Sequence, residues 1–148
     1  MLTLVLVAAA FAAGVAGTWS PCGLSMISTI SPVPSTVELA DAAAIPEVFL
    51  TAWDALVVQG GLTAGRWALI HAGASGVGTA GIQLCKMNHS PCFVTAGSAD
   101  KVARCVALGA SGGADRHTGS FADHVPAWTH NEGFDVILDP VGAGYLGA

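Results

Sequence analysis

Beyond about residue 65, apolar residues fall into short, mostly apolar runs that alternate with helical repeats. The runs at residues 66–71 and 92–96 are bounded by glycine, serine or proline, which is typical of short buried strands. A third run, residues 134–139, is ended by Pro140. Each of the three runs therefore predicts a strand.

Helical spacing separates these strands. Between the first two, apolar residues repeat every three or four positions and predict a helix that ends near Asn88: Val77, Ala80, Gly81, Leu84 and Cys85. After the second strand, Ser98 is a good N-cap, and Gly109 is expected to end the next helix. Residues 111–132 are polar and predict no element. The order strand–helix–strand–helix–strand predicts an α/β fold, a doubly wound parallel sheet of the Rossmann type.

An earlier helix is predicted over residues 41–56. Pro46 is either an interruption or a new start, because proline is tolerated in a first helical turn. Gly60 and Gly61 are expected to end the helix. Its apolar side would contain Val48, Leu50, Thr51, Ala52, Leu56 and Val57.

The first 37 residues carry no charge, and Pro32 and Pro34 mark the joint with the rest of the chain. We therefore predict an apolar N-terminal appendage, residues 1–35, and a dinucleotide-binding domain, residues 36–148. Residues 2–19 form an apolar run that would span about 27 Å as a helix, just short of a bilayer core. Because no lysine or arginine flanks this run, we favour an appendage over a membrane segment or a signal.

The amino-acid composition excludes several classes of protein. Only 10% of the residues are charged and 53% are apolar, which excludes a disordered chain and a coiled coil. Ten acidic residues against five basic ones leave no basic surface for nucleic acid. The four cysteines form no C-x-x-C pair and are interpreted as buried, reduced residues of a cytoplasmic protein. Three histidines, at positions 117, 124 and 130, share no helix face, so no metal is predicted.

Glycines gather where the first strand meets the helix that follows it, in Gly73-Ala-Ser75-Gly76-Val77-Gly78. Such a turn lets the backbone approach a diphosphate closely, while free N–H groups and the positive end of the helix point at the anion. Ser75 stands at the middle glycine position of the G-x-G-x-x-G pattern, and its hydroxyl can donate to a phosphate. The turn therefore predicts a phosphate-binding site.

The end of the second strand offers no acid. NAD-binding folds place Asp or Glu about 20 residues beyond the glycines, to hold the ribose 2′-hydroxyl. Here Gly97 and Ser98 occupy that place, and Lys101 follows within one helical turn. A 2′-phosphate would meet Ser98, Lys101 and the N-terminus of the next helix, so NADPH is favoured over NADH.

At this point the sequence resembles a known family, the NADPH-dependent quinone oxidoreductases. These form the zeta-crystallin-like, zinc-free branch of the medium-chain dehydrogenase/reductase superfamily. The resemblance covers about residues 36–148 and lies in the segments 41–47, 50–53, 64–65, 69–73, 75–80, 82–84, 94–98, 108–110 and 135–139.

The resemblance implies that Gly73, Ser75, Gly76, Val77 and Gly78 bind the pyrophosphate. It implies that Ser98 and Lys101 contact the 2′-phosphate, that Thr51 lies near the nicotinamide, and that Gly142 lies along the cofactor. The substrate would be a quinone or another small conjugated carbonyl. Family members form homo-oligomers, which this sequence does not decide. No catalytic residue is predicted.

The family pattern is matched only in part. Family members are more than twice as long, and residues 1–35 do not resemble their GroES-like domain. The matched segment therefore looks like a truncated cofactor domain, whose 135–139 strand would be an exposed edge. We expect the chain alone to turn over quinone negligibly. A non-catalytic dinucleotide-binding fragment, and a protein anchored to a membrane through residues 2–19, are the alternatives.

Overall fold

The computed structural model describes residues 39–142, with side chains from residue 45 onward. The predicted appendage, residues 1–35, lies outside the described residues. The chain divides into two compact units, Met1–Thr51 and Ala52–Ala148. Helix α3, Leu39–Trp53, belongs to the first unit up to Thr51, and the π-helical segment η1, Asp54–Gln59, which follows it directly, belongs to the second unit.

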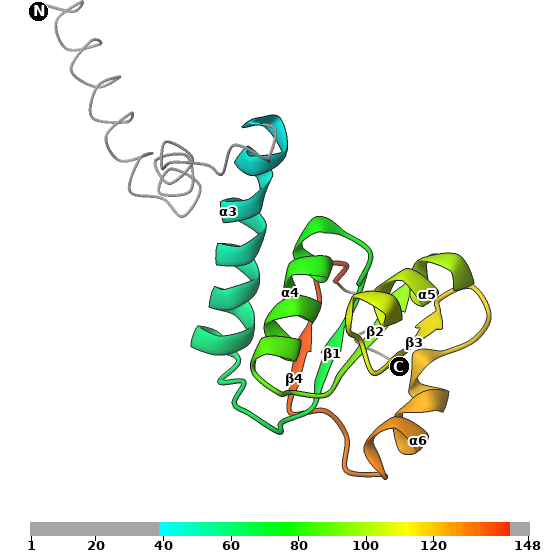
Figure 1. The fold of residues 1–148 in the computed structure, drawn as a ribbon. Helices are drawn as coiled ribbons and strands as arrows, with labels where there is room; N and C mark the ends of the chain where they lie inside the picture. The colour runs from blue at the N-terminus through cyan, green and yellow to red at the C-terminus, as the bar shows by residue number, and fades with distance from the viewer. Residues whose placement is uncertain (1–38, 143–148) are drawn as a thin grey trace, which may run out of the picture. The chain divides into compact units, whose positions relative to one another are not determined.

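The second unit is built on a four-stranded sheet, which Figure 1 shows behind its helices. Its strands are β1 (Ala68–Ile70), β2 (Cys92–Ala96), β3 (Gly112–Asp115) and β4 (Val136–Leu138). They pair in the order β3-β2-β1-β4, and every pair is parallel. The chain therefore moves outward from β1 through β2 to β3 and then crosses to the other side of β1. Such a reversal is the topological switch point of a doubly wound sheet.

Helices α4 (Gly76–Met87) and α5 (Ala99–Leu108) cover one face of this sheet (Figure 1). The core between them is formed by fully or nearly fully buried side chains, among them Leu56, Ile70, Ile82, Cys85, Cys92, Val94 and Cys105. All three described cysteines are free and buried, as the sequence predicted. Short apolar strands buried on both faces are what a parallel sheet requires.

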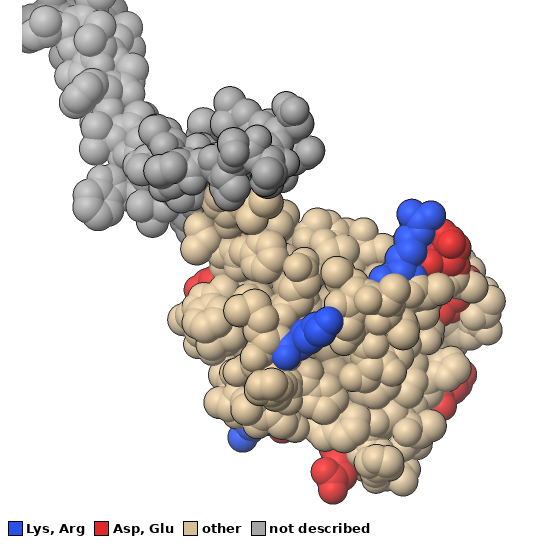
Figure 2. Space-filling model, in the orientation of Figure 1, with Lys and Arg blue, Asp and Glu red and all other residues tan. Residues whose placement is uncertain are grey.

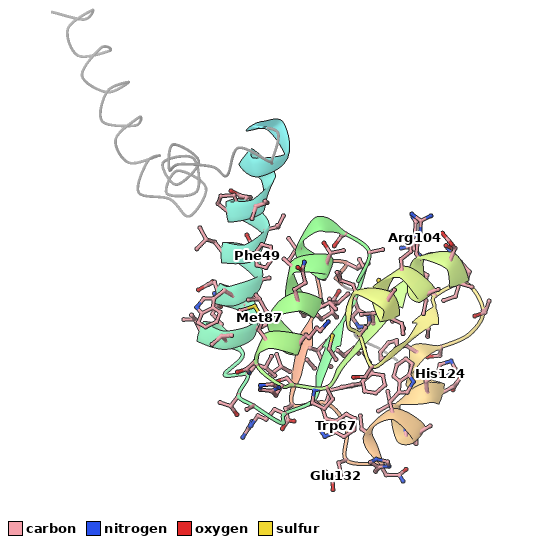
Figure 3. All side chains as sticks on the ribbon, viewed as in Figure 1. Phe49, Trp67, Met87, Arg104, His124 and Glu132 are labelled. Atoms are coloured by element: carbon pink, nitrogen blue, oxygen red, sulfur yellow. The ribbon has the colours of Figure 1, made fainter. Side chains whose placement is uncertain are left out.

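The opposite face carries the short helices η2 (Phe121–His124) and α6 (Val125–Thr129). Successive strand residues point to opposite faces, so Phe93 points away from the core side chain Val94. The Phe93 ring stacks on Trp128 of α6 at 4.9 Å and on Trp67 at 5.8 Å. Trp128 in turn stacks on His124 at 5.2 Å. This aromatic stack holds α6 against the sheet; Figure 3 labels two of its members, Trp67 and His124.

The predicted fold class is confirmed. The strand 92–96, both helix ends and the two caps at Ser98 and Gly109 match the sequence analysis, whereas β1 and β4 are shorter than predicted. The 135–139 strand is an edge of the described sheet, as expected.

Three details differ from the sequence analysis. Pro46 lies inside α3, so it neither interrupts nor starts the helix. Leu50 and Thr51 are exposed, so the apolar side drawn for this helix was wrong at these two positions. Strand β3 was not predicted at all.

Charged side chains are sparse and scattered on the face seen in Figure 2. Within residues 39–142, no helix has both the length and the apolar character needed to cross a membrane.

Candidate dinucleotide-binding site

The turn between β1 and α4 presents backbone N–H groups at the start of a helix. Ser75 is the N-cap, and its Oγ accepts a hydrogen bond of 3.0 Å from the Gly78 N–H. The Thr79 N–H donates to the Ser75 carbonyl at 2.8 Å. In the part of the chain that the structure describes, the N–H groups of Gly76 and Val77 have no acceptor. They point out of the helix, where a phosphate would be bound.

Two glycines of the turn serve close packing. A Cβ on Gly73 would lie 2.7 Å from Val94 Cβ, and a Cβ on Gly78 would lie 2.6 Å from the Ala72 carbonyl oxygen. The first strand and its helix can approach this closely only because both residues lack side chains. Ala72 itself has φ +53°, in the left-handed region, which bends the chain sharply out of β1. Of the residues predicted to contact the pyrophosphate, Gly73 and Gly78 allow close packing, whereas Gly76 and Val77 expose backbone N–H groups.

Ser75 has a second role, as a helix cap, that the sequence analysis did not give it. Its oxygen is already used as an acceptor by the Gly78 amide, so Gly78 offers no free N–H group. The Ser75 hydroxyl proton is still available to donate to a ligand. An anion at this turn would thus meet two amides and one hydroxyl.

A cavity of about 230 Å³ opens beside this turn. It lies at the carboxyl ends of the parallel strands, which is where open α/β sheets bind ligands. Its lining comes from the glycine turn, the end of β2, the start of α5 and the residue after β3: Ala72, Ala74, Ser75, Thr95, Ala96, Gly97, Lys101 and Arg116.

The end of β2 carries positive charge and no carboxylate. Ser98 caps α5 and accepts from the Lys101 N–H at 3.3 Å. Asp100 on α5 is paired with Arg104 at 3.1 Å, and both side chains are exposed. Figure 3 shows Arg104 projecting outward from this helix. Asp115 of β3 is the strand partner of Ala96, and its Oδ1 accepts from the His117 N–H at 3.0 Å. Lys101 lines the cavity, and no acidic residue is among the described residues that line it.

Arg116 is a second cation that the sequence analysis missed. The backbone N–H of Arg116 donates to the Ala96 carbonyl at 2.9 Å. The Arg116 guanidinium lies 3.6–3.8 Å from the position that a Cβ on Gly97 would take. Strand β3 ends at Asp115, so the strand itself delivers Arg116 to the cavity. The sequence predicted no element over residues 111–132, so nothing placed Arg116, which follows Lys101 by 15 residues, next to the predicted site.

A buried polar pair lies behind the cavity. His71 Nδ1 and Thr95 Oγ1 share a hydrogen bond of 2.9 Å, and both residues are 1% exposed. Burial lowers the pKa of His71, although the Asp139 carboxylate opposes this effect. The pKa of Asp139 is also lowered: its Oδ1 accepts from the N–H groups of Gly142 and Val141, and these bonds together with His71 outweigh burial. Neutral imidazole and ionised carboxylate are therefore the favoured forms.

The remaining predicted residues stay predictions. Gly142 has φ +87° and donates its N–H to Asp139 at 2.9 Å. Thr51 is exposed on α3 and belongs to the first unit. Among the described residues, no three of His, Cys, Asp or Glu are grouped so as to hold a metal ion.

Taken together, the strand order, the glycine turn and the cavity define a nucleotide-binding α/β domain. No protein-family model matches the chain. Over 122 residues the chain is 35% identical to the highly reducing polyketide synthase poxF of Penicillium oxalicum, and the match covers 80% of this chain and 5% of that protein. The chain thus spans about one twentieth of the length of this curated relative.

Solved structures of the same class superimpose on the chain. An NAD-dependent alcohol dehydrogenase is 36% identical with a TM-score of 0.67, covering 72% of this chain and 31% of that one. The nucleotide-binding subdomain of the enoylreductase domain of PpsC from Mycobacterium tuberculosis is 33% identical with a TM-score of 0.62, covering 68% and 56%. The quinone oxidoreductase of Thermus thermophilus, also solved with NADPH, is 29% identical with a TM-score of 0.65, covering 76% and 36%.

The chain therefore resembles part of the cofactor domain of medium-chain dehydrogenases/reductases, as its sequence indicated. Quinone oxidoreductases and the enoyl reductase domains of polyketide synthases are both among the similar structures.

Proposed function

We propose that this chain binds NADPH and forms part of an oxidoreductase that transfers hydride to a conjugated carbonyl compound. The observation that carries the proposal is the continuous path from the glycine turn to Lys101 and Arg116 along one cavity. The N–H groups of Gly76 and Val77 would hold the pyrophosphate, as in other nucleotide-binding turns. Lys101 and the guanidinium of Arg116 would hold the 2′-phosphate, an anion that arginine can grip with two hydrogen bonds.

Within this class we propose a quinone as the electron acceptor. The support is the resemblance to quinone oxidoreductases, one of which was solved with NADPH. NADPH supplies the hydride when it is bound, and the chain's own residues position the dinucleotide. A 2-enoyl thioester is the second candidate, because an enoyl reductase domain is 33% identical to the chain and the quinone oxidoreductase is 29% identical. Both acceptors carry a conjugated carbonyl, and little turnover is expected of this chain alone. Binding of an ortho-quinone and of a 2-enoyl thioester to the NADPH-loaded chain, followed by the change in NADPH fluorescence, therefore decides between them.

The test of cofactor choice is a fluorescence titration with NADPH and NADH. One charge-assisted contact contributes about 1.5–3 kcal/mol, so NADPH should bind about tenfold or more tightly than NADH. Lys101→Gln and Arg116→Gln should each reduce this preference. Arg104→Gln is the matched control, because Arg104 lies on the same helix as Lys101 and is paired with Asp100. Equal affinity for the two cofactors, or an equal effect of the control, would refute the 2′-phosphate assignment.

A further inference from the structure

Thr95 contacts both the cavity and the buried His71 ring, so the protonation of His71 decides whether the Thr95 hydroxyl can donate a hydrogen bond into the cavity. Thr95 lines the cavity, and its hydroxyl oxygen lies 2.9 Å from His71 Nδ1 in the interior. A threonine hydroxyl has one proton and two acceptor positions. If Nδ1 is unprotonated, the Thr95 proton is used in the bond to His71. If Nδ1 carries a proton, it donates to Thr95, and the hydroxyl proton is released to point elsewhere.

His71 contacts strand β4 and segment η2 in addition to Thr95. Its backbone N–H donates to the Leu138 carbonyl of β4 at 3.0 Å, and its ring meets the Phe121 ring of η2 edge-on at 4.8 Å. The backbone bond fixes the main chain at His71, and the imidazole contacts the Thr95 hydroxyl and the Phe121 ring. With these contacts kept, the variable is the protonation state of the ring.

Charged groups surround His71 at the end of β4 and on the side of the cavity. Asp139 at the end of β4 favours the protonated ring, while burial disfavours it. On the cavity side, beyond Thr95, Lys101 and Arg116 add positive charge while the cavity is empty. Segment η2 also carries Asp123 and His124, both exposed. A bound polyphosphate would neutralise the cavity cations and add negative charge near Thr95, which shifts the balance toward the imidazolium.

We propose that the neutral His71 ring carries its proton on Nε2, that Nδ1 takes up a second proton when a phosphorylated dinucleotide fills the cavity, and that Thr95 then turns its hydroxyl proton toward the ligand. This inference rests on the proposed dinucleotide site. It makes His71 a positioning residue that acts through Thr95 and links cofactor affinity to pH. Affinity for NADH, whose phosphates stay ionised in this range, should rise as the pH falls from about 7.5 toward 5.5.

The test measures protons and not activity. NADPH is titrated calorimetrically into the protein at about pH 6 in two buffers of different ionisation enthalpy, which gives the number of protons taken up. If the ligand raises the imidazole pKa by about one unit, the protein takes up about half a proton at the midpoint. His71→Asn keeps a group able to hydrogen-bond Thr95 but cannot titrate, so this uptake should disappear. His117→Asn is the matched control, because His117 accepts from Arg116 Nε at 3.4 Å and is the other histidine near the cavity.

Two further measurements keep the test decisive. NADH has no phosphate monoester that titrates in this range, so proton uptake with NADH belongs to the protein alone. In Thr95→Val the protonated ring has no acceptor, so uptake should fall even if His71→Asn does not fold. Equal proton numbers for the wild-type chain and His71→Asn, or loss of uptake in His117→Asn only, would overturn this inference and leave the dinucleotide site standing. Failure to bind either cofactor at any pH would instead overturn the proposed function, and this inference with it.

Discussion

The close approach of α4 to the turn before it gives the sharpest prediction about the fold. Gly78→Ala places a Cβ 2.6 Å from the Ala72 carbonyl oxygen and 2.7 Å from two backbone atoms of Gly73. None of these atoms belongs to a flexible side chain, so the start of the helix must move away. Overpacking of this kind costs up to about 3 kcal/mol. Alanine gains about 1 kcal/mol over glycine in a helix, so the net loss should be about 2 kcal/mol.

Gly81→Ala is the matched control in the same helix. The Cβ there would meet the terminal Cδ1 of Ile70 at 2.9 Å, and the other two atoms near it lie at 3.4 Å or beyond. A rotamer shift of Ile70 costs about 1 kcal/mol, which the helical gain of alanine offsets. Gly81→Ala should therefore leave the free energy of unfolding almost unchanged.

Urea unfolding followed by circular dichroism measures the difference between the two variants. With a slope of about 1.5 kcal/mol per molar urea, Gly78→Ala should lower the midpoint by about 1.3 M. The same samples, titrated with NADPH, show whether the shifted helix also loses cofactor affinity. If Gly78→Ala unfolds at the same urea concentration as the wild-type chain, the tight helix–turn contact does not exist as described.

Three further predictions concern packing, capping and pH. Trp128→Ala removes the half-buried ring that stacks on Phe93 and should lower the free energy of unfolding by about 2 kcal/mol, whereas Trp128→Phe should recover most of it. Ser98→Ala leaves the Lys101 N–H without its cap and should cost about 1 kcal/mol in the same assay, while Ser98→Thr should cost less. Burial lowers the pKa of His71, so below about pH 6.5 the unfolded chain binds more protons than the folded chain. The free energy of unfolding should therefore be constant above that pH and decrease below it. Urea midpoints that stay constant between about pH 7.5 and 5.5, or a His71→Asn variant with unchanged pH dependence, would contradict this last prediction.

Elements with a strong local signal were predictable from the sequence. Helix α4, strand β2 and helix α5 follow from the apolar spacing, the Ser98 cap and the glycine at position 109. The glycine turn was recognisable because its pattern depends on a strand before it and a helix after it. Which of its glycines pack and which expose amides needed three-dimensional distances, as the capped N–H of Gly78 shows.

Strand β3 could not be predicted, and the reason is visible in its contacts. A Cβ on Gly113 would lie 2.6 Å from Val94 Cγ2, and a Cβ on Gly112 would lie 3.1 Å from the Phe93 ring. The neighbouring strand thus demands glycines where a strand pattern would show branched residues. Arg116 was missed for the same reason, since its place depends on β3. The predictions for Thr51 and Gly142 rest on family resemblance and still await a bound cofactor.

Among the described residues, three buried cysteine thiols can report how often the elements around them open. Cys85, Cys92 and Cys105 belong to α4, β2 and α5 and are at most 2% exposed. Contact with Cys85 and burial raise the pKa of Cys92, and burial raises that of Cys105, so neither is reactive in the closed state. Alkylation of each thiol must therefore wait until its own element opens. The three labelling rates, read separately by mass spectrometry, would report how firmly each layer of the nucleotide-binding unit is closed, and which layer a bound dinucleotide tightens.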